Sequence, residues 1–307
     1  MISTVFEKTR PINFIFIILF SFLFFFGVHF FLLKTQINVY SIFKLLGSFS
    51  LVLFSIFLTN FISKKNGLTK DNTYAILIFV LALSFFPYTF SNDRIIISNV
   101  FIFLALRRII SLKTYHNIKL KLFDASLWIC VATIFYEWAL LFFFLVFVAI
   151  LHYGLKDLRN WLIPLVAIFI VIIFITSFYF FTDRIDEFSK ILNFRVELNI
   201  DKYTDLKYLI PLLFTLLVGF MAIFSYFKNI KVKLSEEQSS ILLIIVSFFI
   251  SLFIVLLSDN ENTSEFIFTA FPLAILITNY IEVIAKKWFK EVLLLMFILL
   301  PFFILML

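Results

Sequence analysis

The stretch from Ser91 to Trp138 reads SNDRIIISNVFIFLALRRIISLKTYHNIKLKLFDASLWICVATIFYEW and holds two apolar segments with charged residues close to their ends. In the first segment, Ile95–Leu106 separates Asp93 and Arg94 from the pair Arg107–Arg108. A helix over these residues covers about 18 Å, whereas the hydrocarbon core of a bilayer is about 30 Å thick. The charged side chains at one end of the segment must therefore lie within the membrane, extend to its surface, or cause the bilayer to become thinner around them. Because charges at this depth are often functional, we expect a functional site near this stretch.

The composition of the whole chain predicts a polytopic membrane protein. Of its 307 residues, 63% are hydrophobic and 15% charged, and the mean hydropathy of +1.09 lies outside the range of soluble globular proteins. The apolar runs are long and do not alternate with polar residues, so we expect helices rather than a β-barrel. We predict an all-α bundle that forms one domain over 1–307, with about eleven spans at 12–33, 38–62, 73–90, 93–112, 122–136, 138–153, 161–181, 208–227, 239–258, 266–284 and 291–306.

The distribution of basic residues predicts which side of the membrane each loop faces. With eleven spans, most of the 26 lysines and arginines fall on the side of the N-terminus, and the short loops on the other side, apart from Lys34–Gln36, are acidic or neutral. The positive-inside rule then places the N-terminus inside and the C-terminus outside. The same rule accounts for the net charge of +7, so we expect no nucleic acid as a partner.

One long outer loop, 182–207, has an amphipathic pattern. Ile185, Phe188, Ile191 and Leu192 lie at helical spacing in its first part, and apolar residues alternate with polar ones in its second part. The pattern predicts an amphipathic helix on the outer leaflet, followed by a short extended piece. Two roles are open for this segment: a lid that packs on the bundle, or a guide for a substrate.

The charged residues of the central stretch have two interpretations, because burial of an unpaired charge in the membrane is costly. In the structural interpretation, Arg107 or Arg108 binds Asp124 at the inner side. Arg94 then binds Glu137 at the outer side. In the catalytic interpretation, Asp93 or Glu137 is a general base, and Arg94 binds phosphate as a bidentate donor.

A second group of acidic residues, Asp259, Glu261 and Glu265, directly precedes the predicted helix that contains Phe271–Pro272. Carboxylates in an outer cleft are able to hold a substrate or a divalent cation, or to act as a general base. The alternative is that they are solvated loop residues, because selection for orientation alone enriches outer loops in acids over bases.

Several kinds of chemistry are excluded by the sequence. Its three histidines cannot supply the four-histidine iron site of carotenoid-cleaving oxygenases, and the single cysteine, Cys130, excludes an intramolecular disulfide or a cysteine-based metal cluster. No Walker A motif, zinc-protease motif, nucleophile elbow or CxxC pair occurs. We therefore predict no metal site, and the sequence identifies no cofactor.

Four segments carry a resemblance that covers the whole chain. They are Phe6–Phe14 (FEKTRPINF), Leu104–Lys113 (LALRRIISLK), Phe123–Trp128 (FDASLW) and the Asn-rich loop before Phe271–Leu273 (FPL). Together they resemble an uncharacterised family of multi-pass inner-membrane proteins of flavobacteria and other Bacteroidota. The resemblance implies a bacterial cytoplasmic (inner) membrane and no assigned activity.

Other features are similar to those of the multi-pass glycosyltransferases that use polyprenyl-phosphate sugars, the GT-C fold. The shared features are about eleven helices, an amphipathic outer segment, and an outer acidic loop followed by Phe271–Pro272. Those enzymes carry an acidic catalytic residue in the first outer loop, whereas Lys34–Gln36 here contains no carboxylate. If the chemistry is retained, Asp93 or Glu137 takes over that role.

Three classes of function follow as hypotheses. The first is an enzyme of cell-envelope glycan or lipid-carrier metabolism at the outer leaflet, with a polyprenyl-phosphate lipid as partner. The second is a non-catalytic membrane subunit or scaffold of an envelope complex, whose partners are other membrane subunits and the lipid bilayer. The third is a transporter, which ranks last because only five glycines are present and no internal repeat is evident.

Overall fold

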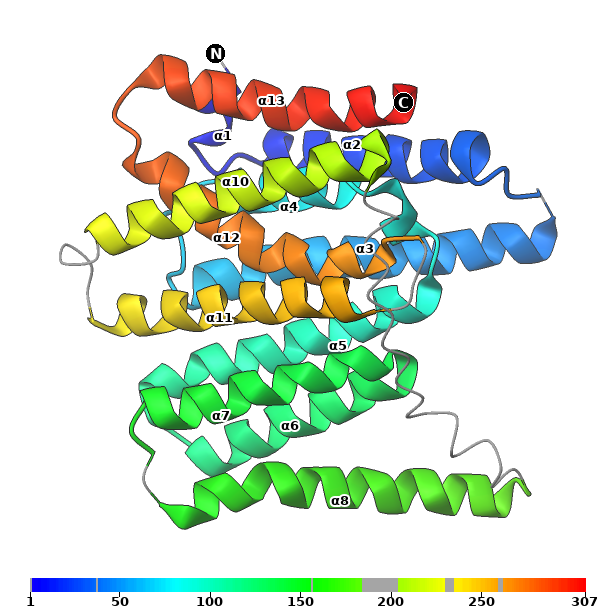
Figure 1. Cartoon of the computed structure of the whole chain (residues 1–307), viewed down its shortest axis with the longest axis vertical. Helices are drawn as coiled ribbons and strands as arrows, with labels where there is room; N and C mark the ends of the chain where they lie inside the picture. The colour runs from blue at the N-terminus through cyan, green and yellow to red at the C-terminus, as the bar shows by residue number, and fades with distance from the viewer. Residues whose placement is uncertain (1, 37, 156, 184–203, 230–234, 259–261) are drawn as a thin grey trace.

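The computed structural model describes residues 2–36, 38–155, 157–183, 204–229, 235–258 and 262–307. Within these ranges the chain forms helices and no β-strand (Figure 1). The helices are α1 (Ile2–Phe6), α2 (Pro11–Gly27), α3 (Val39–Lys65), α4 (Tyr74–Ser84), α5 (Asp93–Ile110), α6 (Ile118–Phe135), α7 (Phe143–His152), α8 (Leu158–Phe181), α10 (Leu206–Asn229), α11 (Ser235–Leu257), α12 (Ile267–Val283) and α13 (Lys287–Met306). Short turns extend several of them: the π-helical η1 (Val28–Leu32) and the 3₁₀-helical η2 (Pro87–Phe90), η3 (Ser111–Thr114), η4 (Glu137–Phe142) and η7 (Ser264–Phe266).

The helices lie side by side and alternate in direction, so the bundle has two ends (Figure 1). We call them the Arg108 end, on the left of Figure 1, and the Asp93 end, on the right, because α5 begins with Asp93 and carries Arg108 in its last turn. Even-numbered helices from α2 to α8, together with α11 and α13, run from the Arg108 end to the Asp93 end. The other long helices run in the opposite direction, from the Asp93 end to the Arg108 end (Figure 1).

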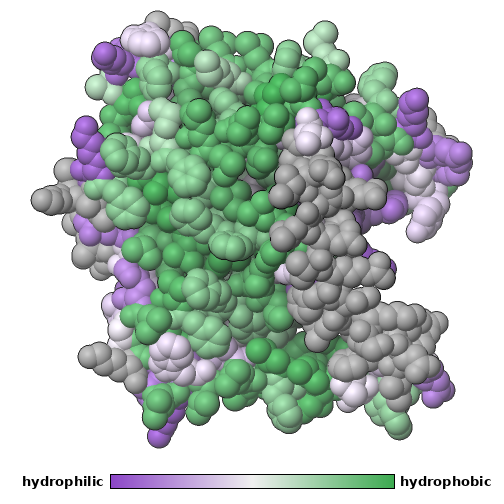
Figure 2. Space-filling model, viewed as in Figure 1, coloured by the Kyte–Doolittle hydropathy of each residue, from purple (hydrophilic) through white to green (hydrophobic). Residues whose placement is uncertain are grey.

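The surface supports the prediction of a helical membrane bundle. Apolar residues cover the middle of the face in view, and hydrophilic residues gather toward its left and right ends (Figure 2). In the described part of the chain, eight helices are long and apolar enough to cross a bilayer. The fold class is therefore confirmed, whereas eleven spans remain a prediction: 73–90, 122–136 and 138–153 are helical, but each is shorter or more charged than those eight.

Two helices, α4 and α12, form the centre of the bundle. All 11 residues of α4 are buried, and 83% of the apolar window of α12 is buried. Phenylalanine rings join them to their surroundings: Phe103 of α5 lies 5.7 Å from Phe79 of α4 and 5.0 Å from Phe271 of α12, between ring centroids. Because protein covers α4 on all sides, this helix does not need the full length of a lipid-exposed span.

Helices α5 and α6 form an antiparallel hairpin that connects this centre to α8. Ser98 Oγ donates a hydrogen bond of 3.0 Å to the carbonyl oxygen of Ala132, and Phe101 stacks on Trp128 and Phe135. On its other side α6 packs against α8, which lies at the edge of the bundle (Figure 1). Since only 11% of the apolar window of α8 is buried, most of its surface is open to lipid or to another protein.

Glycine is required at one helix contact, and this generates a stability prediction. A Cβ atom added to Gly219 of α10 would lie 2.9 Å from Cζ of the buried Phe248 and 3.4 Å from Cδ1 of Leu273. We therefore expect Gly219→Ala to lower the free energy of unfolding by about 1–3 kcal/mol, because the phenylalanine ring must shift inside a packed core. Thermal unfolding of the purified protein in one detergent measures this loss.

The matched control is Gly47→Ala on the exposed side of α3. A Cβ atom there would meet no atom within 4 Å, and alanine favours a helix over glycine by about 0.5–1 kcal/mol. The control is expected to unfold at the same or a higher temperature than the wild-type protein. Equal unfolding temperatures for the two variants would contradict the packing of α10 against α11 and α12.

Candidate functional site

Asp93, predicted as a catalytic base, has protein partners at the start of α5. Asn92 caps the helix, and its side-chain oxygen accepts hydrogen bonds from the N–H groups of Arg94 and Ile95. Asp93 Oδ2 lies 2.9 Å from Lys44 Nζ of α3, and Asp93 Oδ1 accepts a hydrogen bond of 2.5 Å from Ser48 Oγ. Each oxygen of this carboxylate therefore binds a side chain of α3.

A buried histidine, His29, lies at the same end in the π-helical turn η1. Its Nδ1 lies 3.3 Å from Thr35 Oγ1, and its Nε2 lies 3.2 Å from the carbonyl oxygen of Phe90. Its ring contacts Phe25 at 4.6 Å between centroids. Both ring nitrogens thus have partners, and His29 fixes the end of α2 against η2.

The Asp93 end also holds Glu137 and Arg94, but it does not bring them together. Because α5 and α6 are antiparallel and aligned by the bond between Ser98 and Ala132, Asp93 and Glu137 both lie at the same end of the hairpin. Glu137 is half-buried at the start of η4 and makes no hydrogen bond or ion pair with any described residue. Arg94 is exposed and makes no ion pair with the residues that the structure describes.

Glu265, predicted to bind substrate, is 1% exposed and lies in η7, directly before α12. The next residue, Phe266, stacks on Phe86 with ring centroids 3.6 Å apart, which fixes η7 against the end of α4. Asp259 and Glu261, predicted for the same site, lie outside the described residues, and so does most of the predicted amphipathic segment, 184–203.

Asn99, a polar residue buried near this level of the bundle, was not predicted from the sequence. Asn99 is 1% exposed, and neither its amide oxygen nor its amide nitrogen has a partner among the described residues. Helices α5 and α12 run in the same direction and are aligned by the contact of Phe103 with Phe271, so Asn99 lies near the level of Ile267. A single asparagine within an apolar helix belongs to no sequence pattern that would have identified it as important.

At the Arg108 end, the two arginines of the central stretch have different partners. Arg108 Nη2 lies 2.9 Å from Asp124 Oδ2 of α6, and about a third of each side chain is exposed. The guanidinium of Arg107 lies over the ring of Phe61 of α3, 4.9 Å from its centroid. These contacts join α5 to α6 on one side and to α3 on the other.

A network of hydrogen bonds at the Arg108 end was not anticipated from the sequence. Glu291 of α13 accepts hydrogen bonds from the N–H groups of Ile2 and Ser3, and Glu282 of α12 accepts from the N–H of Lys70 and the side chain of Asn72. These acids hold the N-terminal segment and the loop before α4 against the bundle. Both acids lie close in the sequence to the basic run 286–290, which could have drawn attention to them, but neither belongs to a recognisable motif.

The same loop carries an ion pair at the surface. Asp71 Oδ1 lies 2.9 Å from Lys64 Nζ and accepts a hydrogen bond of 2.9 Å from Thr9 Oγ1. These two hydrogen bonds hold the pKa of the Asp71 carboxyl below its ordinary value. Asp71 is exposed, and its contacts join the N-terminal segment to the loop between α3 and α4.

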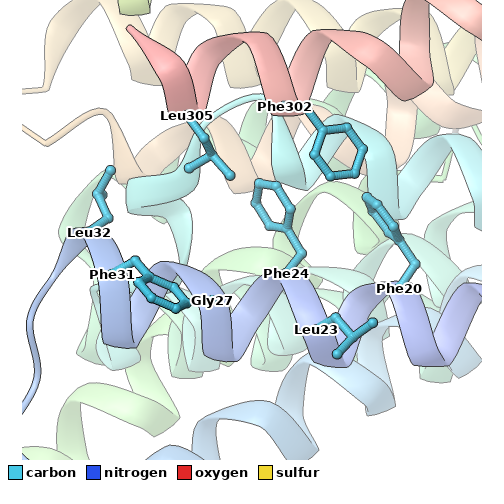
Figure 3. A pocket seen from close by; sticks show the side chains of 8 residues that line it. All are labelled: Phe20, Leu23, Phe24, Gly27, Phe31, Leu32, Phe302 and Leu305. Atoms are coloured by element: carbon cyan, nitrogen blue, oxygen red, sulfur yellow. The ribbon is translucent and has the colours of Figure 1, made fainter.

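Two apolar grooves open on the sides of the bundle. One, of 430 Å³, lies between α2 and α13, where Phe302 and Leu305 face Phe24 and Leu32 across an open space beside Gly27 (Figure 3). The other, of 460 Å³, lies between η4–α7 and α11 and is lined by seven apolar side chains. Grooves of this chemistry suit acyl or isoprenoid chains. In the described part of the chain, no group of three His, Cys, Asp or Glu residues is arranged to hold a metal ion.

Comparison with known proteins identifies a family for the chain. The model of DUF6427, a family of unknown function, matches residues 7–306, in agreement with the uncharacterised family expected from the sequence. No curated protein and no solved structure matched the chain. The family match names no source organism and shows no resemblance to GT-C glycosyltransferases. Because it extends over almost the whole chain, this membrane protein belongs to the DUF6427 family of unknown function.

Proposed function

We propose that the protein is a non-catalytic membrane component of a cell-envelope complex in the bacterial cytoplasmic membrane. One observation carries the proposal: three of the charged residues in the central stretch have partners within the chain. Asp93 binds Lys44 and Ser48, and Arg108 binds Asp124. A structural role accounts for these contacts without a substrate, because each charge is neutralised where it approaches the apolar part of the bundle.

Helix α8 is the surface where we expect another subunit. Its buried residues, Asn160, Pro164 and Ala167, form one narrow stripe at helical spacing. Large apolar side chains cover the rest of the helix, including Phe169, which is 65% exposed, and Phe174, which is 73% exposed. Because only this stripe is buried against the chain, the remaining surface of α8 is open and a neighbouring helix is able to pack on it.

Photo-crosslinking tests the proposed subunit contact. A photoreactive phenylalanine analogue at Phe174 is expected to form a covalent adduct with a second protein in intact membranes, visible as a shifted band and identifiable by mass spectrometry. The control position is Phe224 of α10, which is 75% exposed compared with 73% for Phe174, so the two probes differ in helix and not in exposure.

The two positions distinguish a partner from lipid. The proposal predicts a protein adduct at Phe174 at least several times more abundant than at Phe224, and the same partner at fixed stoichiometry after gentle extraction. Equal, weak labelling at both positions, together with a protein that extracts without a stoichiometric partner, would contradict it.

A second candidate is an enzyme of envelope glycan or lipid-carrier metabolism, similar to GT-C glycosyltransferases and acting on a polyprenyl-phosphate lipid at the outer leaflet. The observation that favours it is the burial of Glu265 at the Asp93 end. A buried carboxyl group near the start of α12 is suited to orient a substrate hydroxyl or to accept its proton. The lateral grooves supply apolar surface for an isoprenoid chain.

Complementation of cells that lack the gene separates the two candidates. If Glu265 acts on a substrate, Glu265→Gln is expected to abolish restoration of the wild-type envelope phenotype while folded protein accumulates normally in the membrane. Glu137→Gln, which changes a half-buried acid at the same end, is the matched variant.

If the protein is a structural component, restoration by Glu265→Gln and Glu137→Gln is expected to follow the amount of folded protein. Full restoration by Glu265→Gln at the wild-type protein level would contradict the enzymatic candidate.

A further inference from the structure

The apolar groove between α2 and α13 extends over one half of the membrane span that α2 begins. The residues of this span that line the groove start at Phe20, near the middle of Pro11–Leu32, and end at Leu32 at the Asp93 end. At helical rise they cover about 18 Å, compared with about 15 Å for one half of the hydrocarbon core. At mid-span the rings of Phe20 and Phe302 meet edge to face, 6.1 Å apart between centroids, and bound the groove (Figure 3). The groove therefore has the length of one lipid leaflet.

Gly27, between the two ends of the groove, leaves its middle open. A Cβ atom added to Gly27 would meet no atom within 4 Å, so no close helix contact requires glycine there. Gly67 and Gly154, in contrast, have positive φ, and Gly219 packs directly on Phe248. Glycine inside a helix is less favourable than alanine, because it loses more conformational freedom on folding. The structural effect of Gly27 is thus an open space beside α2, which indicates room for a ligand.

The wall of the groove at the Asp93 end is an irregular helical turn that is held in place. The π-helical η1 begins directly after Gly27 and contributes Phe31 and Leu32 to the lining. Turns of this kind occur frequently at functional sites. The buried His29 fixes η1, because its Nε2 lies 3.2 Å from the carbonyl oxygen of Phe90 in η2. A wall that is already fixed lowers the entropic cost of binding a flexible ligand.

A cation, Lys34, adjoins the groove at the Asp93 end. Lys34 is exposed, follows Leu32 by two residues, and makes no ion pair with the residues that the structure describes. The N–H of Thr35 donates a hydrogen bond of 3.0 Å to the carbonyl oxygen of His29, which fixes the turn that carries Lys34. A basic residue at the end of a membrane span lies near the depth of the lipid headgroups and attracts anionic lipids. The charge of Lys34 therefore complements a lipid phosphate whose chain lies in the groove.

We propose that this groove binds one acyl chain of an anionic phospholipid from the leaflet at the Asp93 end, with the phosphate near Lys34. A transmembrane helix is a poorer occupant, because it is about 10–12 Å wide and crosses both leaflets, whereas the groove ends at Phe20 and Phe302. The inference is independent of the proposed function, since α2 and α13 lie at the edge of the bundle opposite α8 (Figure 1).

Photo-crosslinking with a lipid probe tests the site. The full-length protein in phosphatidylcholine vesicles receives phosphatidylglycerol with a diazirine at the end of one acyl chain, and mass spectrometry quantifies the labelled peptides. The wild-type protein is expected to carry several times more label near Phe20 and Phe302 than on α8. Helix α8 is the internal control, because Phe169 lies near the middle of its span and is 65% exposed to the same membrane.

Three variants locate the chain and the headgroup. Gly27→Leu is expected to lower the label near Phe20 and Phe302 several-fold and to leave the label on α8 unchanged, because the new side chain fills the groove. Gly47→Leu, at the other helical glycine where an added Cβ would meet no atom within 4 Å, is the control and is expected to label as the wild-type protein does. The wild-type protein is expected to favour the phosphatidylglycerol probe over a phosphatidylcholine probe about two- to fivefold, and Lys34→Ala is expected to abolish this preference.

The first result that would overturn the proposal requires no variant: equal labelling of α8 and of the peptides that contain Phe20 and Phe302 in the wild-type protein. Unchanged labelling in folded Gly27→Leu would also overturn it. Equal labelling by the two probes in the wild-type protein would refute the anionic headgroup. If unlabelled polyprenyl phosphate displaced the probe at a lower concentration than unlabelled phosphatidylglycerol, the assignment to a phospholipid would be wrong.

Discussion

The pairing of charges at the two ends of the α5–α6 hairpin is the constraint on which the rest of the structure depends. Burial of an ionised side chain near hydrocarbon is costly unless the charge is paired. At one end of the hairpin Asp93 binds Lys44 of the neighbouring helix α3, and at the other end Arg108 binds Asp124 within the hairpin. Between these ends, Ser98 bonds the two helices directly. The hairpin thereby joins the aromatic centre around α4 and α12 to α8, whose other contacts are few.

Long apolar runs allowed the helices to be predicted from the sequence, because a run that must cross a bilayer has few other structures open to it. Tertiary partners were harder to predict. Lys44 lies inside the predicted span 38–62 and is therefore itself a charge within the membrane. No pattern in the sequence indicates that it pairs with Asp93, which lies in another helix. Glu291 and Asn99 gave no motif, since the first binds backbone N–H groups far away in the sequence and the second is one amide in an apolar helix.

The two ends of the bundle have different characters. At the Arg108 end, acids and amides hold loops and the N-terminal segment in place. At the Asp93 end, Glu265 is buried in η7, which packs on η2, and Asn99 is buried near the level of Ile267.

Exchange of the charges in the pair of Lys44 with Asp93 tests the structural account most directly. Lys44→Asp and Asp93→Lys are made singly and together, and the amount of folded protein in the membrane and the restoration of the envelope phenotype are measured for each. The account predicts that each single variant loses folded protein and that the double variant recovers much of it, with function recovering in parallel. Single variants that fold like the wild-type protein, with function lost in Asp93→Lys and not recovered in the double variant, would contradict it and assign chemistry to Asp93.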